Sequence, residues 1–140
     1  MPKFERESQV NVTPGYIQIK TSKIPKAGKG AFATEDIPKD ITFGEYLGEI
    51  YTGKEIQNTD GDYLFSVRKN GREVKIIDGQ DPKKSSWVRY VNTTLENGEG
   101  NARFFQYKQR IFIRTTKKIK KGEEIYAYYG DDYVNTKIKG

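Results

Sequence analysis

The sequence predicts a mostly β fold made of short strands with one short helix. Short segments rich in β-branched and aromatic residues alternate apolar and polar side chains, which is the period of a half-buried strand. Glycine and asparagine separate these segments at short intervals, as turns between strands require. Only one stretch carries a helix start signal, so helices should contribute little to the fold.

Six segments are expected to form strands, and local turn signals indicate how some of them pair. Asn70-Gly71 predicts a hairpin turn, because these residue types tolerate positive φ. A second pairing is expected across Lys120-Lys121-Gly122, between the last two segments. The longest segment contains Gly44 and Gly48, which should interrupt it. In chain order, the predicted strands are residues 16–19, 41–50, 63–67, 73–77, 110–114 and 125–129.

One short helix is expected from about Lys83 to Val91. Asp81 can cap its N-terminus, and Pro82 suits the first helical position because proline has no N–H to satisfy there. Residues 1–15, which include Pro14, are expected to form a loosely held lead-in to the folded domain.

The composition fits one compact domain. The chain has 140 residues, of which 34% are hydrophobic, and it contains ten tyrosines, seven phenylalanines and one tryptophan within the alternating segments. It has no cysteine and no histidine, which excludes disulfides, Cys or His metal sites, thiol nucleophiles and His-dependent triads. No segment has the Asp-rich spacing of a calcium loop, so no metal site is expected.

The charge and the hydropathy pattern bear on the partners of the chain. The formal net charge is +6, and no apolar run approaches the ~20 residues that a membrane span needs. We therefore expect a soluble, intracellular protein without a membrane partner. Two interpretations of the basic cluster stay open, a solvated turn and a surface that contacts nucleic-acid phosphates. The cluster consists of Lys117, Lys118, Lys120 and Lys121.

Four sequence blocks occur in a fixed order ahead of a strand-like segment that ends in Tyr129-Gly130. The blocks are Lys26–Ala33, Phe43–Glu49, Asp62–Phe65 and Trp87–Asn92. Together with Gly122–Gly130, they resemble the SET domain of protein-lysine methyltransferases. The block Arg89–Asn92 and the tail Gly130–Tyr133 are similar to its PR/SET branch.

The resemblance covers about residues 16–133, which would be the SET domain, with the lead-in at 1–15 and a tail at 134–140. It implies a β-clip, SET-type fold of short curved sheets. In such a fold, a C-terminal segment threads under an earlier loop in a pseudoknot-like arrangement.

The resemblance also implies S-adenosylmethionine-dependent methylation of a protein lysine, on a histone tail in the nucleus. Tyr129 corresponds to the catalytic tyrosine, and Tyr46 to a residue that lines the lysine channel. A phenol suits this chemistry because its hydroxyl can align the reacting groups, and tyrosine faces stabilise an alkylammonium by about 0.5–2 kcal/mol. Without the resemblance, both residues would be read as ordinary strand aromatics. A cationic histone tail also needs negative charge near the channel, and this is expected from four acidic residues that flank the catalytic strand, Glu123, Glu124, Asp131 and Asp132.

The remaining site residues are likewise assigned by the resemblance. Apolar side chains along the channel leave space and remove a water-holding hydroxyl, so a higher methylation state is expected. The expected donor-binding residues are Ala27, Gly28, Lys29, Tyr63, Asn92 and Thr93, of which Asn92 would offer both an acceptor and donors. The expected channel residues are Phe104, Ile113 and Tyr133.

Two other functions remain open at this point. A PR/SET-type module without catalytic activity would keep the fold and bind proteins. A basic nucleic-acid-binding domain would use the lysine cluster, with binding that weakens steeply as salt rises.

Overall fold

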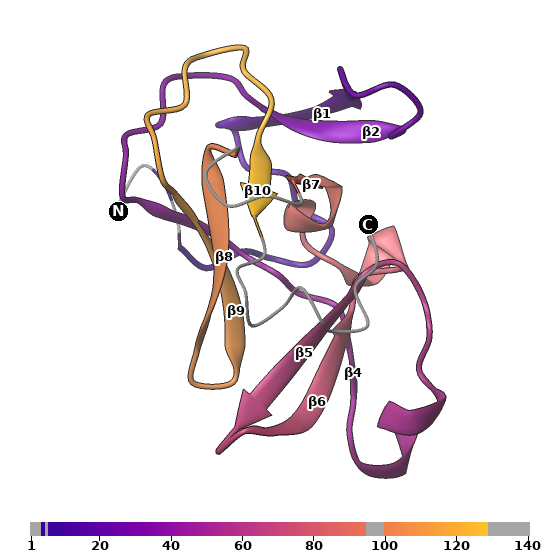
Figure 1. The fold of residues 1–140 in the computed structure, drawn as a ribbon. Helices are drawn as coiled ribbons and strands as arrows, with labels where there is room; N and C mark the ends of the chain where they lie inside the picture. The colour runs from indigo at the N-terminus through magenta and orange to yellow at the C-terminus, as the bar shows by residue number, and fades with distance from the viewer. Residues whose placement is uncertain (1–3, 5, 95–99, 129–140) are drawn as a thin grey trace.

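The structure is a computed structural model that describes residues 4, 6–94 and 100–128. Within these residues the chain forms short strands in three sheets, with three short 3₁₀ helices between them (Figure 1). This arrangement confirms the prediction of a mostly β fold with short sheets and little helix.

The first sheet is an antiparallel pair of β1 (Ile17–Thr21) and β2 (Lys29–Ala33). β1 confirms the first predicted strand, with its bounds shifted by one to two residues. β2 was not predicted, because its glycine-rich start was interpreted only as a turn. The turn is present: Gly28 has φ +76°, a backbone conformation that favours glycine, and β2 begins directly after it.

The second sheet has five strands in the order β3-β9-β8-β10-β7. β10 lies parallel to both of its neighbours, whereas β8 and β9 form an antiparallel hairpin. The strands are β3 (Thr42–Glu45), β7 (Asn92–Thr94), β8 (Ala102–Tyr107), β9 (Arg110–Thr115) and β10 (Tyr126–Tyr128).

The predicted pairing of residues 110–114 with residues 125–129 is wrong. β9 pairs with β3 and β8, and β8 separates it from β10. The connection between them does turn at Gly122, but it is tied to the N-terminal part of the chain, with Ile119 bridging to Ile37 and Glu124 to Phe32. These contacts lead the chain around the sheet, so β10 enters between β7 and β8.

The third sheet has the order β4-β6-β5 and is antiparallel. Its strands are β4 (Glu49–Tyr51), β5 (Leu64–Lys69) and β6 (Arg72–Asp78). The predicted hairpin is confirmed, with Asn70 and Gly71 both at positive φ in the turn.

The single long strand predicted over residues 41–50 is wrong, because β3 and β4 belong to different sheets. The chain changes sheet at Gly48, which lies against the backbone of β6. A Cβ atom at this position would overlap the carbonyl of Asp78, so only glycine allows so close an approach.

Three 3₁₀ helices replace the one predicted helix. They are η1 (Gly53–Asn58), η2 (Pro82–Lys84) and η3 (Trp87–Tyr90). The predicted start is confirmed, since the Asp81 side chain accepts a hydrogen bond from the N–H of Lys83 and Pro82 follows the cap. η2 ends before Ser85 and Ser86. The hydroxyl of Ser85 donates to the carbonyl of Asp81 and that of Ser86 to the carbonyl of Glu45, and such side-chain bonds to the backbone compete with helix formation.

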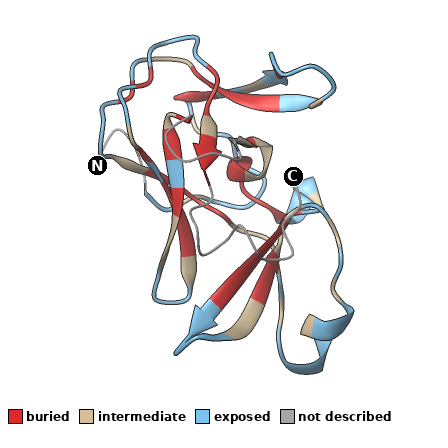
Figure 2. Ribbon diagram, viewed as in Figure 1, coloured by how far each residue is buried: buried red, intermediate tan, exposed pale blue. Residues whose placement is uncertain are grey.

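Buried side chains from all three sheets form one core. Figure 2 shows buried residues along β8, β9 and β10 and in the halves of β5 and β6 that face them. The almost completely buried side chains include the phenylalanines Phe32, Phe43, Phe65 and Phe104. The core thus fixes the relative positions of the segments that carry the predicted site residues.

The described part of the lead-in packs on this core, which corrects the expectation that it is loosely held. Phe4 makes an edge contact with Tyr16, Glu7 forms an ion pair with Arg110, and the N–H of Asn11 donates to a backbone carbonyl of the η2–η3 connection. The predicted threading of the C-terminal segment falls on residues 129–140, which lie outside the described residues. The proposed domain boundaries stay predictions.

Candidate functional site

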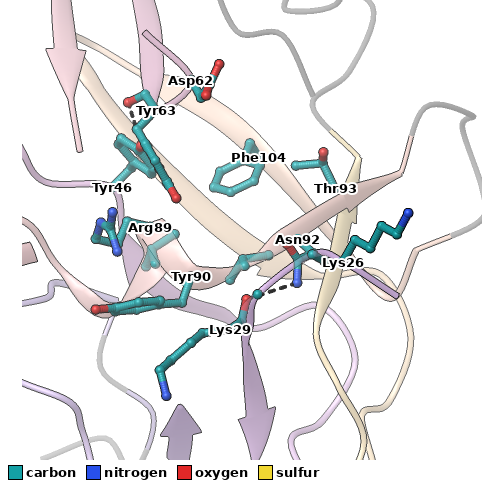
Figure 3. Close-up of a pocket in the computed structure, with 14 residues that line it drawn as sticks. Lys26, Lys29, Tyr46, Asp62, Tyr63, Arg89, Tyr90, Asn92, Thr93 and Phe104 are labelled. Atoms are coloured by element: carbon teal, nitrogen blue, oxygen red, sulfur yellow. Dashed lines mark hydrogen bonds between the residues drawn. The ribbon is translucent and has the colours of Figure 1, made fainter. Parts of the chain in front are cut away.

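A pocket of about 640 Å³ opens between the start of β2, the loop before β5 and the η3–β7 segment. This volume is typical of sites that hold a small organic ligand. Figure 3 shows the aromatic side chains of Tyr46, Tyr63 and Phe104 on one side and the backbone of Lys29 beside Asn92 on the other. The predicted site residues that line it are Ala27, Gly28, Lys29, Tyr46, Tyr63, Asn92, Thr93 and Phe104.

The remaining predicted site residues do not lie in this pocket. Ile113 has an exposed fraction of 0% and packs in the core beside Gly44, so the structure does not place it on the pocket wall. Tyr129 and Tyr133 lie outside the described residues.

Asn92 holds together the two segments that carry the predicted donor-binding residues. Its amide nitrogen donates to the backbone carbonyl of Lys29, at 3.2 Å, and to the carboxylate of Glu124, at 3.1 Å. Both partners can only accept, which fixes the orientation of the amide. Its two N–H groups are therefore already used, and the side chain has only its carbonyl oxygen to offer to a ligand. The expectation that it also offers donors is corrected accordingly.

The hydroxyl of Tyr46 is committed to the backbone. It donates to the carbonyl of Tyr63, at 2.6 Å, and the N–H of Gly79 donates to the same oxygen, at 2.9 Å. The ring is 4% exposed and packs against Phe65 and Phe104, with ring centroids 4.7 and 6.2 Å away. Tyr46 therefore lines the pocket with part of its aromatic ring, while its hydroxyl is bonded to the backbone.

Arg89 also lines the pocket, although it was not predicted as a site residue. Its guanidinium lies over the rings of Tyr63 and Tyr90, 4.3 and 4.7 Å from their centroids. Its Nε donates to the carbonyl of Gly79, at 2.6 Å, and its Nη2 to that of Gln80, at 3.1 Å. Arg89 thus links η3 to the end of β6 and to the tyrosine before β5. The available signal was its position between Trp87 and Tyr90 in the sequence, but this position does not reveal the contacts with Gly79, Gln80 and Tyr63.

Glu124 is a second residue that supports the pocket. It was expected only to supply negative charge near the catalytic strand, not to hold other site residues. Its carboxylate is buried and accepts four hydrogen bonds. Burial alone would raise the pKa of Glu124, but these hydrogen bonds outweigh it and hold the pKa below its ordinary value of 4.5. The stability that they contribute is therefore fully present above pH 4.5 and is lost as the pH falls through the lowered pKa. Burial and the bond to Glu124 raise the pKa of Tyr126 to about 12.

Glu123, one of the acidic residues expected near the channel, does not line the pocket. The lysine cluster does not line it either. Glu123 is exposed and accepts from the backbone N–H of Lys120, at 2.6 Å, which closes its own turn. Lys118 forms an exposed ion pair with Asp36, and none of the four clustered lysines lines the pocket. Asp131 and Asp132 lie outside the described residues.

None of the helices in the described residues has the length and apolarity to cross a membrane. The same part of the chain contains no group of three or more potential metal ligands.

A model of the PR domain of PR domain zinc finger protein 2 matches residues 17–139. The chain belongs to the PR-domain family. This match confirms the resemblance to the PR/SET branch of SET domains, and it covers every block on which that resemblance was based.

This PR domain is similar to parts of larger proteins named as methyltransferases. It is 35% identical over 127 residues to the Homo sapiens histone-lysine N-methyltransferase PRDM7, covering 90% of this chain and 25% of that protein. It is 36% identical over 122 residues to the Caenorhabditis elegans histone-lysine N-methyltransferase set-17, covering 87% of this chain and 43% of that protein. The chain thus spans less than half the length of either relative.

Solved structures share the fold. The methyltransferase domain of human PR domain-containing protein 2 superimposes with a TM-score of 0.71 at 29% identity, covering 88% of this PR domain and 83% of that chain. A polycomb repressive complex 2 bound to S-adenosylmethionine gives a TM-score of 0.67 at 27% identity, covering 85% of this chain and 16% of that one. The SET-type fold of this PR domain is therefore confirmed.

We expect Arg89→Lys to destabilise the PR domain by about 1–2 kcal/mol. A lysine ammonium cannot stack flat between two rings while donating to two carbonyls, so part of the cation–π and hydrogen-bond energy is lost. Urea unfolding measures the change in the free energy of unfolding. Arg72→Lys, an exposed change at the start of β6, should stay within about 0.5 kcal/mol of wild type. Equal effects of the two changes would contradict the role assigned to Arg89.

Proposed function

We propose that this PR domain transfers a methyl group from S-adenosylmethionine to a lysine side chain of a protein, namely a histone tail in the nucleus. One observation carries the proposal: a single pocket is lined by all six residues that the family resemblance assigns to the donor, and they come from three separate segments. The names of the relatives PRDM7 and set-17, and the S-adenosylmethionine bound in a structural neighbour, support the same reaction.

The residues of the pocket fit the amino-acid end of the donor. The side-chain carbonyl oxygen of Asn92 accepts no hydrogen bond from the described residues, and it is an acceptor suited to an ammonium group. Lys26 and Lys29 also line the pocket and are exposed, so their positive charge is available to a carboxylate. At Gly28 nothing lies within 4 Å of the position of a Cβ atom, so the backbone there is open to a ligand. S-adenosylmethionine supplies the activated methyl group when it is bound.

The aromatic wall fits the other substrate. A lysine must lose its proton and its water before it can attack, and an apolar lining favours both changes. Tyr46, Tyr63 and Phe104 provide ring surface there, and rings also stabilise the methylated ammonium product. Tyr129 follows directly after β10 in the sequence, and we propose that its hydroxyl is the group that aligns the amine with the methyl donor.

The test is a pair of measurements on the wild-type protein and on Tyr129→Phe. Calorimetry should detect S-adenosylmethionine binding to both proteins. Transfer of labelled methyl groups to core histones should fall roughly 10²-fold in the variant, the usual effect of removing one hydrogen bond made in the transition state. Tyr107→Phe is the matched control, because this tyrosine is 54% exposed on β8 and does not line the pocket. It should remain fully active.

The alternatives correspond to distinct results of these measurements. A wild-type protein that folds but gives no heat with the donor is a PR/SET-type protein-binding module. A protein whose activity is absent, but which binds nucleic acid with steep salt dependence through the lysine cluster, is a nucleic-acid-binding domain. Either result rejects the methyltransferase proposal.

A further inference from the structure

The carboxylate of Glu124 is a buried charge that the proposed reaction does not use. The residue is 3% exposed and lies just before β10. Two of its four hydrogen-bond donors follow β1, namely the hydroxyl of Ser22, at 2.6 Å, and the N–H of Lys23, at 2.9 Å. The other two are the amide of Asn92, at 3.1 Å, and the hydroxyl of Tyr126, at 2.8 Å. One side chain thereby joins three segments of the chain.

An ionised carboxylate satisfies all four donors of this environment. Each of its oxygens accepts two of the four hydrogen bonds, and all four partners face it as donors. The N–H of Lys23 donates to one oxygen and the amide of Asn92 to the other, and neither group can accept, so the NH₂ group of a glutamine would face an obligate donor on either side. Leaving buried donors unsatisfied is costly, so the site discriminates strongly between two side chains of almost equal shape.

The segment that Glu124 holds is the one that forms the donor side of the pocket. Ser22, which donates to Glu124, also accepts from the N–H of Ile24, at 3.0 Å. A Cβ atom at Gly30 would overlap the Oε2 atom of Glu124, so β2 passes directly against the carboxylate. Between these two positions lie Ala27, Gly28 and Lys29 on the pocket wall. Asn92, which is itself held by Glu124, closes the segment by its bond to Lys29.

We propose that Glu124 is a positioning residue for the methyl donor: its carboxylate fixes residues 22–30 and Asn92 in the conformation that forms the donor side of the pocket. The identity of the ligand, S-adenosylmethionine, rests on the proposed function. The hold of Glu124 on residues 22–30 and Asn92 is a property of the protein without ligand. Glu124 does not line the pocket, so it acts through the residues it holds.

The test compares Glu124→Gln with Glu123→Gln, which makes the same change at the neighbouring residue. Glu123 is exposed and accepts from one N–H, so one amide oxygen can replace it. In the absence of any ligand, the amide hydrogens of Lys23 and Ile24 should exchange at least about tenfold faster in Glu124→Gln, while those of the β5–β6 hairpin keep their wild-type rates. Glu123→Gln should change neither group.

The same two variants are then compared in donor binding and kinetics. Glu124→Gln should weaken S-adenosylmethionine binding in calorimetry about tenfold or more. Its KM for the donor should rise by a similar factor, while kcat at saturating donor and the KM for a histone peptide stay within about twofold of wild type. A merely structural role would instead lower the fraction of active protein and leave the donor KM unchanged.

Ser22→Ala serves as a second variant in case Glu124→Gln does not fold. It leaves the carboxylate in place and removes one donor, together with the acceptor for the N–H of Ile24. Faster exchange at Ile24 with a weaker donor affinity supports the proposal. The proposal is overturned if Glu124→Gln and Ser22→Ala both keep the amide exchange rates and the donor affinity of the wild-type protein. It is also overturned if amide exchange becomes faster by the same factor throughout the protein in both variants.

Failure of the proposed function would be recognised separately. If the wild-type protein gives no heat with S-adenosylmethionine, the methyltransferase proposal fails. Faster exchange confined to residues 22–30 in Glu124→Gln would then still support the hold of Glu124 on that segment, and unchanged exchange would overturn it.

Discussion

Phe104→Ala is expected to lower the free energy of unfolding by about 3–5 kcal/mol, the usual cost of removing a buried phenylalanine. The side chain is 2% exposed and lies at the centre of an aromatic cluster, with the ring of Phe65 4.7 Å away and that of Tyr46 6.2 Å away. Phe65 lies on β5 and Tyr46 directly follows β3, so neither neighbour can collapse into the space and most of the cavity should persist. Urea unfolding measures the change.

The adjacent residue provides a matched control. Phe105 has the same side chain one position along β8, but it points to the other face of the sheet, where it is only half-buried and stacks on Phe112. Phe105→Ala should therefore cost less than Phe104→Ala. A cost at Phe105 equal to or greater than that at Phe104 would contradict the central place of Phe104 in the core.

The parts of the fold that could be predicted from the sequence are those whose cause is local. The β5–β6 hairpin was predicted because Asn70-Gly71 specifies the turn whatever surrounds it. The start of η2 was predicted for the same reason, since Asp81 caps the backbone within its own turn. Where the cause is distant, prediction failed. Nothing near Gly48 in the sequence indicates that the carbonyl of Asp78 will press against it.

The position of β10 shows the same limit on a larger scale. The sequence of β10 predicts a strand, and the structure confirms it. Its neighbours, however, depend on the connection before it, in which Glu124 bridges to Phe32 and Ile119 to Ile37. Such strand pairings depend on contacts between distant parts of the chain. The alternation of apolar and polar residues along one strand does not indicate them. A hairpin with the nearest predicted strand was therefore the natural expectation, and it was wrong.

The candidate site follows a similar division. The blocks that resemble SET domains pointed to eight residues that line one pocket, because a family motif carries spatial information that composition lacks. The residues that support this pocket were not identified. Arg89 acts through a backbone carbonyl at the end of β6, and Glu124 through donors about 100 residues earlier in the chain. Neither partnership leaves a local pattern.

Gly79→Ala is expected to destabilise the protein by about 1–3 kcal/mol and to disturb the pocket wall at Tyr46, because the added methyl group has no space. A Cβ atom there would lie 2.5 Å from the hydroxyl oxygen of Tyr46 and 2.9 Å from the ring carbon that carries it. Tyr46 cannot retreat, since its ring is packed between Phe65 and Phe104 and its hydroxyl is bonded to Tyr63. Thermal unfolding and the methyl-transfer assay measure the two effects.

A double-mutant cycle with Tyr46→Phe identifies the cause of this effect. Removing the hydroxyl takes away the atom that the new methyl group would meet first, so the double variant should be more stable than the sum of the two single changes predicts. Gly15→Ala is the control for the substitution itself, because nothing lies within 4 Å of a Cβ atom at that position, and it should unfold like wild type. Strict additivity in the cycle would contradict a clash with Tyr46 as the cause of the destabilisation.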